Sequence, residues 1–167
     1  MSGKIRILGI DPGSQVTGLG VVDASEKRQL EVCYYGCIKT ARKEPLPIRL
    51  KQIYDGLIGV MQKFQPDYVA LEDMFYSDNV KTAIVMGQAR GVALLAPVMM
   101  GITPAEYSPR EVKLSVVGNG NASKNQVQYM IKNMLNLQKE DIPMDASDAL
   151  AVAICHFHRL TDVTRSK

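Results

Sequence analysis

The sequence predicts a single α/β domain built on a mixed sheet, in which an antiparallel meander is followed by alternating helices and strands. The chain has 167 residues, a length that suits one domain. Hydrophobic residues make up 46% of it and charged residues 22%, as in ordinary globular proteins. Apolar runs of strand length alternate with segments of helical periodicity, without a linker or repeat between them. We therefore expect residues 1–167 to form one unit, with an ordered core over about residues 4–160.

The meander is expected at the start of the chain. Residues 7–10 form an apolar run, which the Asp-Pro-Gly-Ser turn at residues 11–14 ends. Residues 16–23 and 30–39 have the character of strands, and the polar segment 24–28 provides the turn between them. The first three strands can therefore pair as antiparallel neighbours.

An amphipathic helix is expected over residues 46–64, because apolar side chains recur there every three to four positions. These positions are Leu50, Ile53, Leu57, Val60, Met61 and Phe64. Pro66 ends this helix, and the apolar run 68–71 then predicts a further strand with Glu72 at its carboxyl end. An acid thus follows an apolar strand twice, at Asp11 and at Glu72.

A second helix is expected over residues 79–96, with Gly87 and Gly91 four positions apart on one face. Each glycine costs a helix about 1 kcal/mol, so a packing reason is expected. The pair could lie at the interface of a homodimer or be buried inside the same domain, and the sequence leaves both open. The remaining elements are a short strand near 102–107, helical segments near 109–116 and 124–136, and a final helix from Pro143 to Leu160.

Four carboxylates carry the chemical interpretation. Asp11 and Glu72 end strands, whereas Asp145 and Asp148 lie three positions apart at the start of the last, largely apolar helix. Each has an ordinary alternative, since an aspartate before Pro-Gly forms turns and acids in a first helical turn complement the helix dipole. The four converge only if the helix packs across the strand ends.

Carboxylates gathered in this way would repel one another unless cations lay between them. Ligand sets made only of oxygen favour hard ions such as Mg²⁺ or Mn²⁺ over zinc. Two such ions, about 3.5 to 4 Å apart, can activate water and stabilise the leaving oxygen in an attack on phosphate. The pattern therefore predicts phosphodiester hydrolysis.

Composition argues against several other classes of protein. The first residues lack a long apolar segment and we expect no stretch of the ~20 apolar residues that span a bilayer, so a cytoplasmic protein without a membrane role is predicted. Three cysteines do not suggest a disulfide framework, and their spacing to His156 and His158 does not match a zinc site. The net charge of +3 does not by itself indicate a nucleic-acid-binding protein.

Several motifs occur in an order that resembles one family. They are Gly9-Ile10-Asp11-Pro12-Gly13-Ser14, Leu71-Glu72-Asp73-Met74-Phe75, Gly87-Gln88-Ala89-Arg90-Gly91, Tyr107-Ser108-Pro109-Arg110-Glu111-Val112-Lys113 and Asp145-Ala146-Ser147-Asp148-Ala149-Leu150-Ala151. Together they resemble the RuvC Holliday-junction resolvases of bacteria, crossover junction endodeoxyribonucleases of the ribonuclease H-like superfamily. The resemblance spans nearly the whole chain.

The resemblance implies a ribonuclease H-like fold with a mixed five-stranded sheet flanked by helices, and a homodimer that nicks a four-way DNA junction symmetrically in recombination and repair. It also implies Mg²⁺-dependent catalysis, with Asp11, Glu72, Asp145 and Asp148 as both catalytic residues and metal ligands. The RuvA and RuvB branch-migration proteins are the partners it implies.

Three further residues match family positions that contact DNA. Phe75 corresponds to an aromatic side chain placed against unstacked bases, although core packing is the ordinary fate of phenylalanine. Lys113 and Lys124 correspond to basic residues near the scissile strand, although lysines usually lie on solvated helix faces.

The sequence departs from the family pattern in one place, and one neighbour of a catalytic position needs an explanation. Ser123 precedes Lys124 where many relatives carry an acid. Asp73 directly follows Glu72, and alternation along a strand predicts that its side chain points away. Two rival functions remain, an actin-like ATPase, for which the chain supplies only about one lobe, and a non-catalytic junction-binding module.

Overall fold

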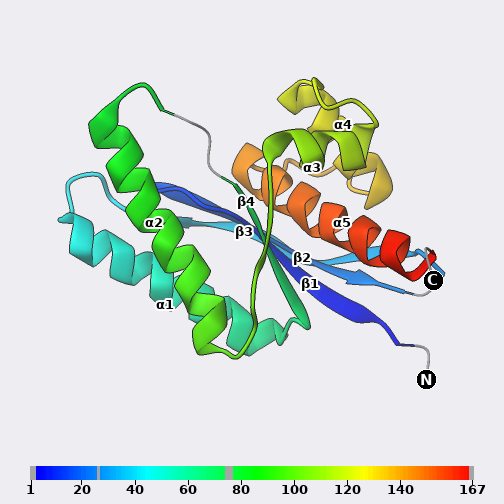
Figure 1. Cartoon of the computed structure of the whole chain (residues 1–167), viewed down its shortest axis with the longest axis horizontal. Helices are drawn as coiled ribbons and strands as arrows, with labels where there is room; N and C mark the ends of the chain where they lie inside the picture. Colours follow the sequence, from blue (N-terminus) through cyan, green and yellow to red (C-terminus); the bar gives the residue numbers. More distant parts are fainter. Residues whose placement is uncertain (1–2, 26, 74–76, 166–167) are drawn as a thin grey trace.

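A mixed sheet forms the centre of the molecule. The computed structural model describes residues 3–25, 27–73 and 77–165. Within these residues the sheet has five strands in the order β3-β2-β1-β4-β5 (Figure 1). The strands are β1 (Ile5–Asp11), β2 (Val16–Ala24), β3 (Leu30–Lys39), β4 (Tyr68–Glu72) and β5 (Ala105–Tyr107). β1, β2 and β3 pair antiparallel, whereas β4 runs parallel to both β1 and β5, which confirms the predicted α/β class and mixed sheet.

Helices cover both faces of the sheet. They are α1 (Leu46–Phe64), α2 (Val80–Met99), α3 (Pro109–Val117), α4 (Lys124–Met134) and α5 (Met144–Arg165). α1 and α2 cover one face, and α5 crosses the other beneath α3 and α4 (Figure 1). Three bounds differ from prediction, since β5 is only three residues long, α2 continues through Pro97 to Met99, and α5 runs beyond Leu160. A proline in the last turn removes one hydrogen bond without ending the helix.

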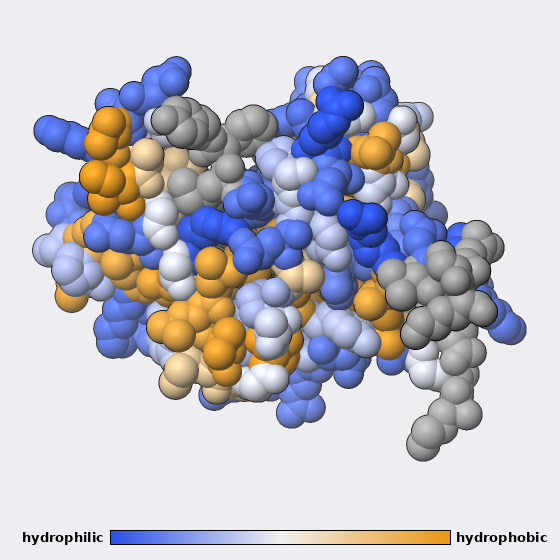
Figure 2. Space-filling view, viewed as in Figure 1, coloured by the Kyte–Doolittle hydropathy of each residue, from blue (hydrophilic) through white to orange (hydrophobic). Residues whose placement is uncertain are grey.

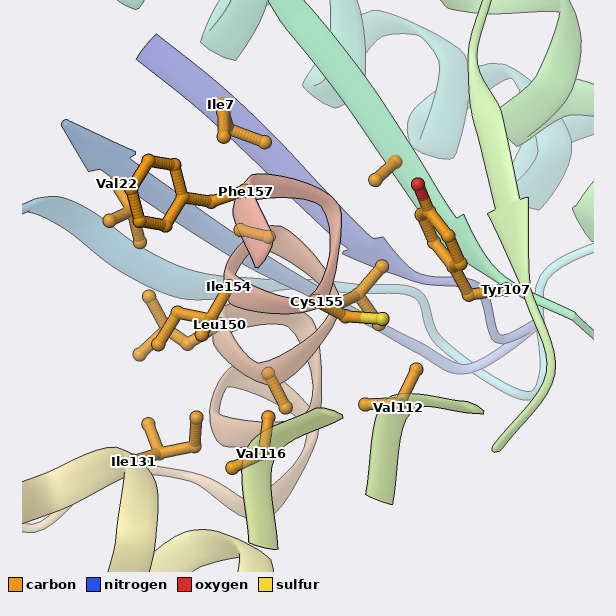
Figure 3. Close-up of a cluster of buried hydrophobic side chains, with 14 of the residues drawn as sticks. Ile7, Val22, Tyr107, Val112, Val116, Ile131, Leu150, Ile154, Cys155 and Phe157 are labelled. Carbon is orange, nitrogen blue, oxygen red and sulfur yellow. The ribbon is translucent and has the colours of Figure 1, made fainter. Parts of the chain in front are cut away.

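Alternation along the strands builds two cores. Leu8 and Ile10 of β1 point toward α1 and α2, while Ile7 points toward α5. On the α5 side, Leu150 and Ile154 pack between the sheet and the short helices α3 and α4 (Figure 3). Most of the middle of α5 is therefore buried all round, as its long apolar run predicts.

Two glycines let α5 lie directly on the sheet backbone. A Cβ atom at Gly9 of β1 would overlap the carbonyl oxygen of Ala149, and one at Gly18 of β2 would overlap that of Asp145. Because a side chain at either position would push α5 away, these glycines fix its distance from β1 and β2. The first turn of α5 is thereby held against the sheet.

Helix α2 corrects one expectation. By length and composition alone, it is the one helix of the described residues that could cross a membrane, whereas no such segment was predicted. Only 22% of its most apolar window is buried. The physical reason is that α2 has apolar residues on two sides, with Ala89, Ala93 and Ala96 against the sheet and α1 and other apolar side chains facing outward.

The cysteines divide into two groups. Cys155 is buried in α5, as expected of a small hydrophobic side chain, whereas Cys33 and Cys37 are half-buried in β3.

Candidate active site

Two carboxylates meet at the end of the parallel strand pair. β1 and β4 run parallel with Ile10 opposite Leu71, so the next residue on each strand, Asp11 and Glu72, lies at the same edge of the sheet. Ile10 and Leu71 point toward α1 and α2, and the two acids therefore point toward α5. The two carboxyl groups lie close enough to interact, since the charge of Glu72 raises the pKa of Asp11.

The first turn of α5 brings the other two acids to this edge. Asp148 lines a pocket with Asp11 and Glu72. Asp145, one turn earlier, lies toward β2 and β3, with its carbonyl oxygen against Gly18. Burial and then the charge of Asp145 raise the pKa of the Cys37 thiol in β3. The structure thus brings Asp11, Glu72 and Asp148 into one pocket, while Asp145 lies nearby without lining it.

The surroundings of Asp11 and Glu72 disfavour the ionised form of both carboxyl groups. Burial, followed by the charges of Glu72, Asp148 and Asp145, raises the pKa of Asp11 to about 8. Burial and the charge of Asp148 raise the pKa of Glu72 to about 7. Because the two groups interact, they titrate as a pair. The site therefore holds a proton at neutral pH that a bound cation would displace.

Two lysines reach the same pocket from α3 and α4. Lys124 Nζ lies 3.1 Å from Asp148 Oδ2, and its charge lowers the pKa of Glu72. Lys113 lines the pocket as well. Both predicted basic residues are therefore beside the acids rather than on a remote helix face.

Ser123, the residue that departs from the family pattern, has a structural role at the start of α4. Its hydroxyl accepts a hydrogen bond from the backbone N–H of Gln126 at 3.2 Å, and the Gln126 side chain accepts one from the Ser123 N–H at 2.8 Å. This capping box fixes the start of α4. Lys124, the first residue of that helix, is positioned by it.

The pocket has a volume of about 210 Å³. Its walls come from the loop after β1, the end of β4, and all the helices except α1. They are formed by Asp11, Pro12, Glu72, Asp73, Met86, Pro109, Val112, Lys113, Lys124, Val127, Asp148 and Ala151. The acids lie among apolar side chains, which explains why burial is the largest cause of their raised pKa values.

The donor atoms suit a hard divalent cation, because they are carboxylate oxygens that repel one another and retain a proton. Their present arrangement is not a finished ligand set. Among the residues that the structure describes, no three acidic, histidine or cysteine side chains surround a common point closely enough to hold an ion. Asp148 also keeps one oxygen on Lys124. Ion binding would therefore require the carboxylates to be deprotonated and to move closer to a common point.

Phe75, the predicted stacking residue, lies outside the described residues. The sequence analysis assigned no role to Arg90, whose side chain in α2 reaches the end of β4. The available signal was an arginine in the middle of a mainly apolar helix. Asp73 pairs with this arginine, with Oδ1 at 3.1 Å from Arg90 Nη2, and it also lines the pocket that contains Glu72.

Comparison with known proteins gives a consistent result. A family model described as "Crossover junction endodeoxyribonuclease RuvC" matches residues 7–156. Proteins of that name from Magnetococcus marinus and Desulforamulus reducens are 48% and 46% identical to this chain. The alignments cover 93% and 90% of this chain and 85% and 91% of those proteins.

Solved structures agree in fold. Thermus thermophilus RuvC in complex with a Holliday junction substrate matches with a TM-score of 0.86 at 31% identity, covering 94% of this chain and 96% of that one. A yeast mitochondrial Holliday junction resolvase, at 16% identity, shares the fold with a TM-score of 0.67 and covers 96% of this chain and 82% of its own. The order of the motifs, the profile match over most of the chain and the sequence identity agree, and the chain belongs to the RuvC family of crossover junction endodeoxyribonucleases.

Proposed function

We propose that this protein is a structure-selective endodeoxyribonuclease that resolves Holliday junctions by symmetric, paired hydrolysis of phosphodiester bonds. The observation that carries the proposal is the convergence of the Asp11, Glu72 and Asp148 carboxylates in one pocket of a chain that belongs to the RuvC family. The relative from T. thermophilus was solved with such a junction as its substrate. Recombination and repair are the processes that need this reaction.

The metal-binding catalytic residues of the proposal are Asp11, Glu72, Asp145 and Asp148. Mg²⁺ is the proposed ion, two per site, with Mn²⁺ able to substitute, because the donors are all carboxylate oxygens. When bound, such ions activate a water molecule and stabilise the leaving oxygen of an in-line displacement. Asp11 and Glu72, whose pKa values are raised, would have to be deprotonated in order to act as ligands.

Lys113 and Lys124 bind phosphate oxygens of the cleaved strand in this proposal. Lys124 is paired with Asp148 in the free protein, so its ammonium group is already within the pocket. Transfer of Lys124 from Asp148 to a phosphate would release a carboxylate oxygen for the ion. Phe75 is proposed to stack against an unpaired base near the junction centre.

We propose that the enzyme is a homodimer that associates through the outer side of α2. In Figure 2 apolar side chains lie near both ends of this helix and form an interrupted band along it. Its members are between 52% and 71% exposed and are Val80, Ile84, Leu95, Val98 and Met99. Gly87 and Gly91 lie exposed in the same band, and a Cβ at either would meet no atom within 4 Å, which argues against burial inside this chain as their reason. A two-fold pair of subunits would suit paired cleavage of a two-fold substrate.

The partners and the cellular location of the protein are proposed from the family to which the chain belongs. RuvA and RuvB, which drive branch migration, are the proposed partners, and the cytoplasm is the proposed location. The apolar outer side of α2 is assigned to the second subunit rather than to a membrane.

Substrate choice tests the proposal. Purified protein would be given an end-labelled synthetic four-way junction and a linear duplex of the same sequence, each with Mg²⁺ or with EDTA. We expect metal-dependent nicks at symmetry-related positions of the junction and an intact duplex. Junction binding without cleavage under any divalent ion would favour a non-catalytic module. ATP hydrolysis without junction binding would favour an actin-like function.

A further inference from the structure

Arg90 spans the ends of two strands next to the acid pocket, whose wall includes its partner Asp73 but not Arg90 itself. Its side chain is 12% exposed. Nη1 donates a hydrogen bond to the backbone oxygen of Glu72 at 3.2 Å, and Nη2 pairs with Asp73 Oδ1 at 3.1 Å. Nη2 also pairs with the carboxylate of Glu106 on β5. One guanidinium group therefore holds the last residue of β4, the residue after it, and the neighbouring strand.

The backbone supports the same junction from within the sheet. Glu72 lies opposite Tyr107 in the β4–β5 pair, and the Asp73 N–H donates to the Tyr107 backbone oxygen at 2.6 Å. β5 is only three residues long, so few ladder hydrogen bonds hold this end of the sheet. Arg90 connects this end of the sheet to α2. The helix itself is packed into the core through its small residues Ala89 and Ala93.

We infer that Arg90 is a positioning residue for the Glu72 carboxylate. Leu71 and Glu106 point toward α2, and Glu72 points to the other face, so Arg90 touches the carbonyl group of Glu72 and not its carboxylate. It acts by fixing the peptide from which the carboxylate projects. Planar geometry with several donors lets arginine make these contacts at once, which a lysine cannot do.

This inference deepens the proposed function and rests on the role of Glu72 as a metal ligand. Groups that orient a metal ligand commonly change metal affinity or activity 10- to 100-fold when they are removed, in order of magnitude. We expect Arg90→Gln to weaken Mn²⁺ binding by roughly that factor and to slow single-turnover junction cleavage similarly. Junction affinity in EDTA should change by no more than about twofold, because the Arg90 side chain does not itself line the pocket. The Mn²⁺ affinity and cleavage rate of Arg90→Lys should lie between those of the wild type and Arg90→Gln.

Arg6 provides the matched control. Its Nε and Nη2 atoms donate to the two carboxylate oxygens of Asp23 at 2.7 and 2.9 Å. Its Nη1 atom donates to the Phe64 carbonyl oxygen at 2.8 Å. Arg6 therefore also binds a carboxylate and a backbone carbonyl group with one guanidinium. It does so near the start of β1, whereas Asp11 lies at the other end of that strand. Arg6→Gln should lower the melting temperature while Mn²⁺ affinity and the cleavage rate of the folded protein stay as in wild type.

The experiment measures Mn²⁺ binding by electron paramagnetic resonance and single-turnover cleavage, at a temperature where each variant is folded. The variants are Arg90→Gln, Arg90→Lys, Arg6→Gln and Glu72→Gln. Equal Mn²⁺ affinity in Arg90→Gln and Arg6→Gln would overturn the inference. If Arg90→Gln does not fold, wild-type Mn²⁺ affinity in Arg90→Lys overturns it instead. Wild-type Mn²⁺ affinity in Glu72→Gln would refute the metal-ligand role itself, and the inference with it, whatever the arginine variants do.

Discussion

Replacing Asp11 with asparagine should stabilise the metal-free protein while abolishing its activity. The pKa of Asp11 is raised from 3.8 to about 8 in the folded state, first by burial and then by Glu72, Asp148 and Asp145. A raised folded-state pKa means that the folded protein binds more protons than the unfolded chain between these values. The stability of the wild type therefore falls as the pH rises from about 4 to about 8.

The magnitude follows from the linkage of about 1.4 kcal/mol for each pH unit in this window. From pH 4 to pH 7 the loss approaches about 4 kcal/mol as an upper limit, and we expect at least about 2 kcal/mol of it to be measurable. The asparagine side chain of the variant carries no charge and escapes this cost. For a chain of this size, 2 kcal/mol corresponds to a difference of about 4 to 8 °C in melting temperature.

The assay is thermal unfolding of wild type and Asp11→Asn in EDTA from pH 5 to pH 8, repeated with Mg²⁺. We expect the stability advantage of the variant to widen with pH in EDTA. Mg²⁺ should raise the melting temperature of the wild type more than that of the variant, because only the wild type has the full ligand set. Parallel pH profiles for the two proteins in EDTA would refute the reasoning.

Three further predictions concern the surroundings of the site. Gly18→Ala should cost about 1 to 3 kcal/mol in the free energy of unfolding and reduce cleavage, since a Cβ there overlaps the first turn of α5; normal stability by denaturant titration would contradict this. Leu95→Lys should shift the sedimentation coefficient toward that of a monomer, whereas Leu114→Lys, at a similarly exposed leucine on α3, should not; identical behaviour of the two would remove the proposed interface. Ser123→Ala should cost about 1 kcal/mol through loss of the helix cap and slow cleavage through Lys124; an unchanged melting temperature would count against it.

The strand-end acids could be predicted because their signals are local. An apolar run that stops at a carboxylate identifies both a strand and the residue at its end, so Asp11 and Glu72 followed directly from the sequence. The amphipathic period of residues 46–64 identified α1 in the same way. The family resemblance then supplied the five-stranded sheet.

Other features depend on contacts between distant segments. The close packing of α5 on the sheet requires Gly9 and Gly18. This packing could not be predicted, because a glycine in a strand does not indicate which helix will approach it. Arg90 is similar, because its partners Glu72 and Glu106 come from two strands that meet only after folding. Position in the sequence also could not show that Asp148, rather than Asp145, lines the pocket with the strand-end pair.

The most direct test of the central claim is single-turnover cleavage of a labelled four-way junction by wild type and Asp11→Asn, with junction binding measured on the same samples in EDTA. We predict that the wild type makes paired nicks only with Mg²⁺ or Mn²⁺, and that the variant binds the junction with wild-type affinity but makes no nicks. Cleavage at the wild-type rate by the variant would contradict the assignment of catalysis to the carboxylates at the end of β1, β4 and the start of α5.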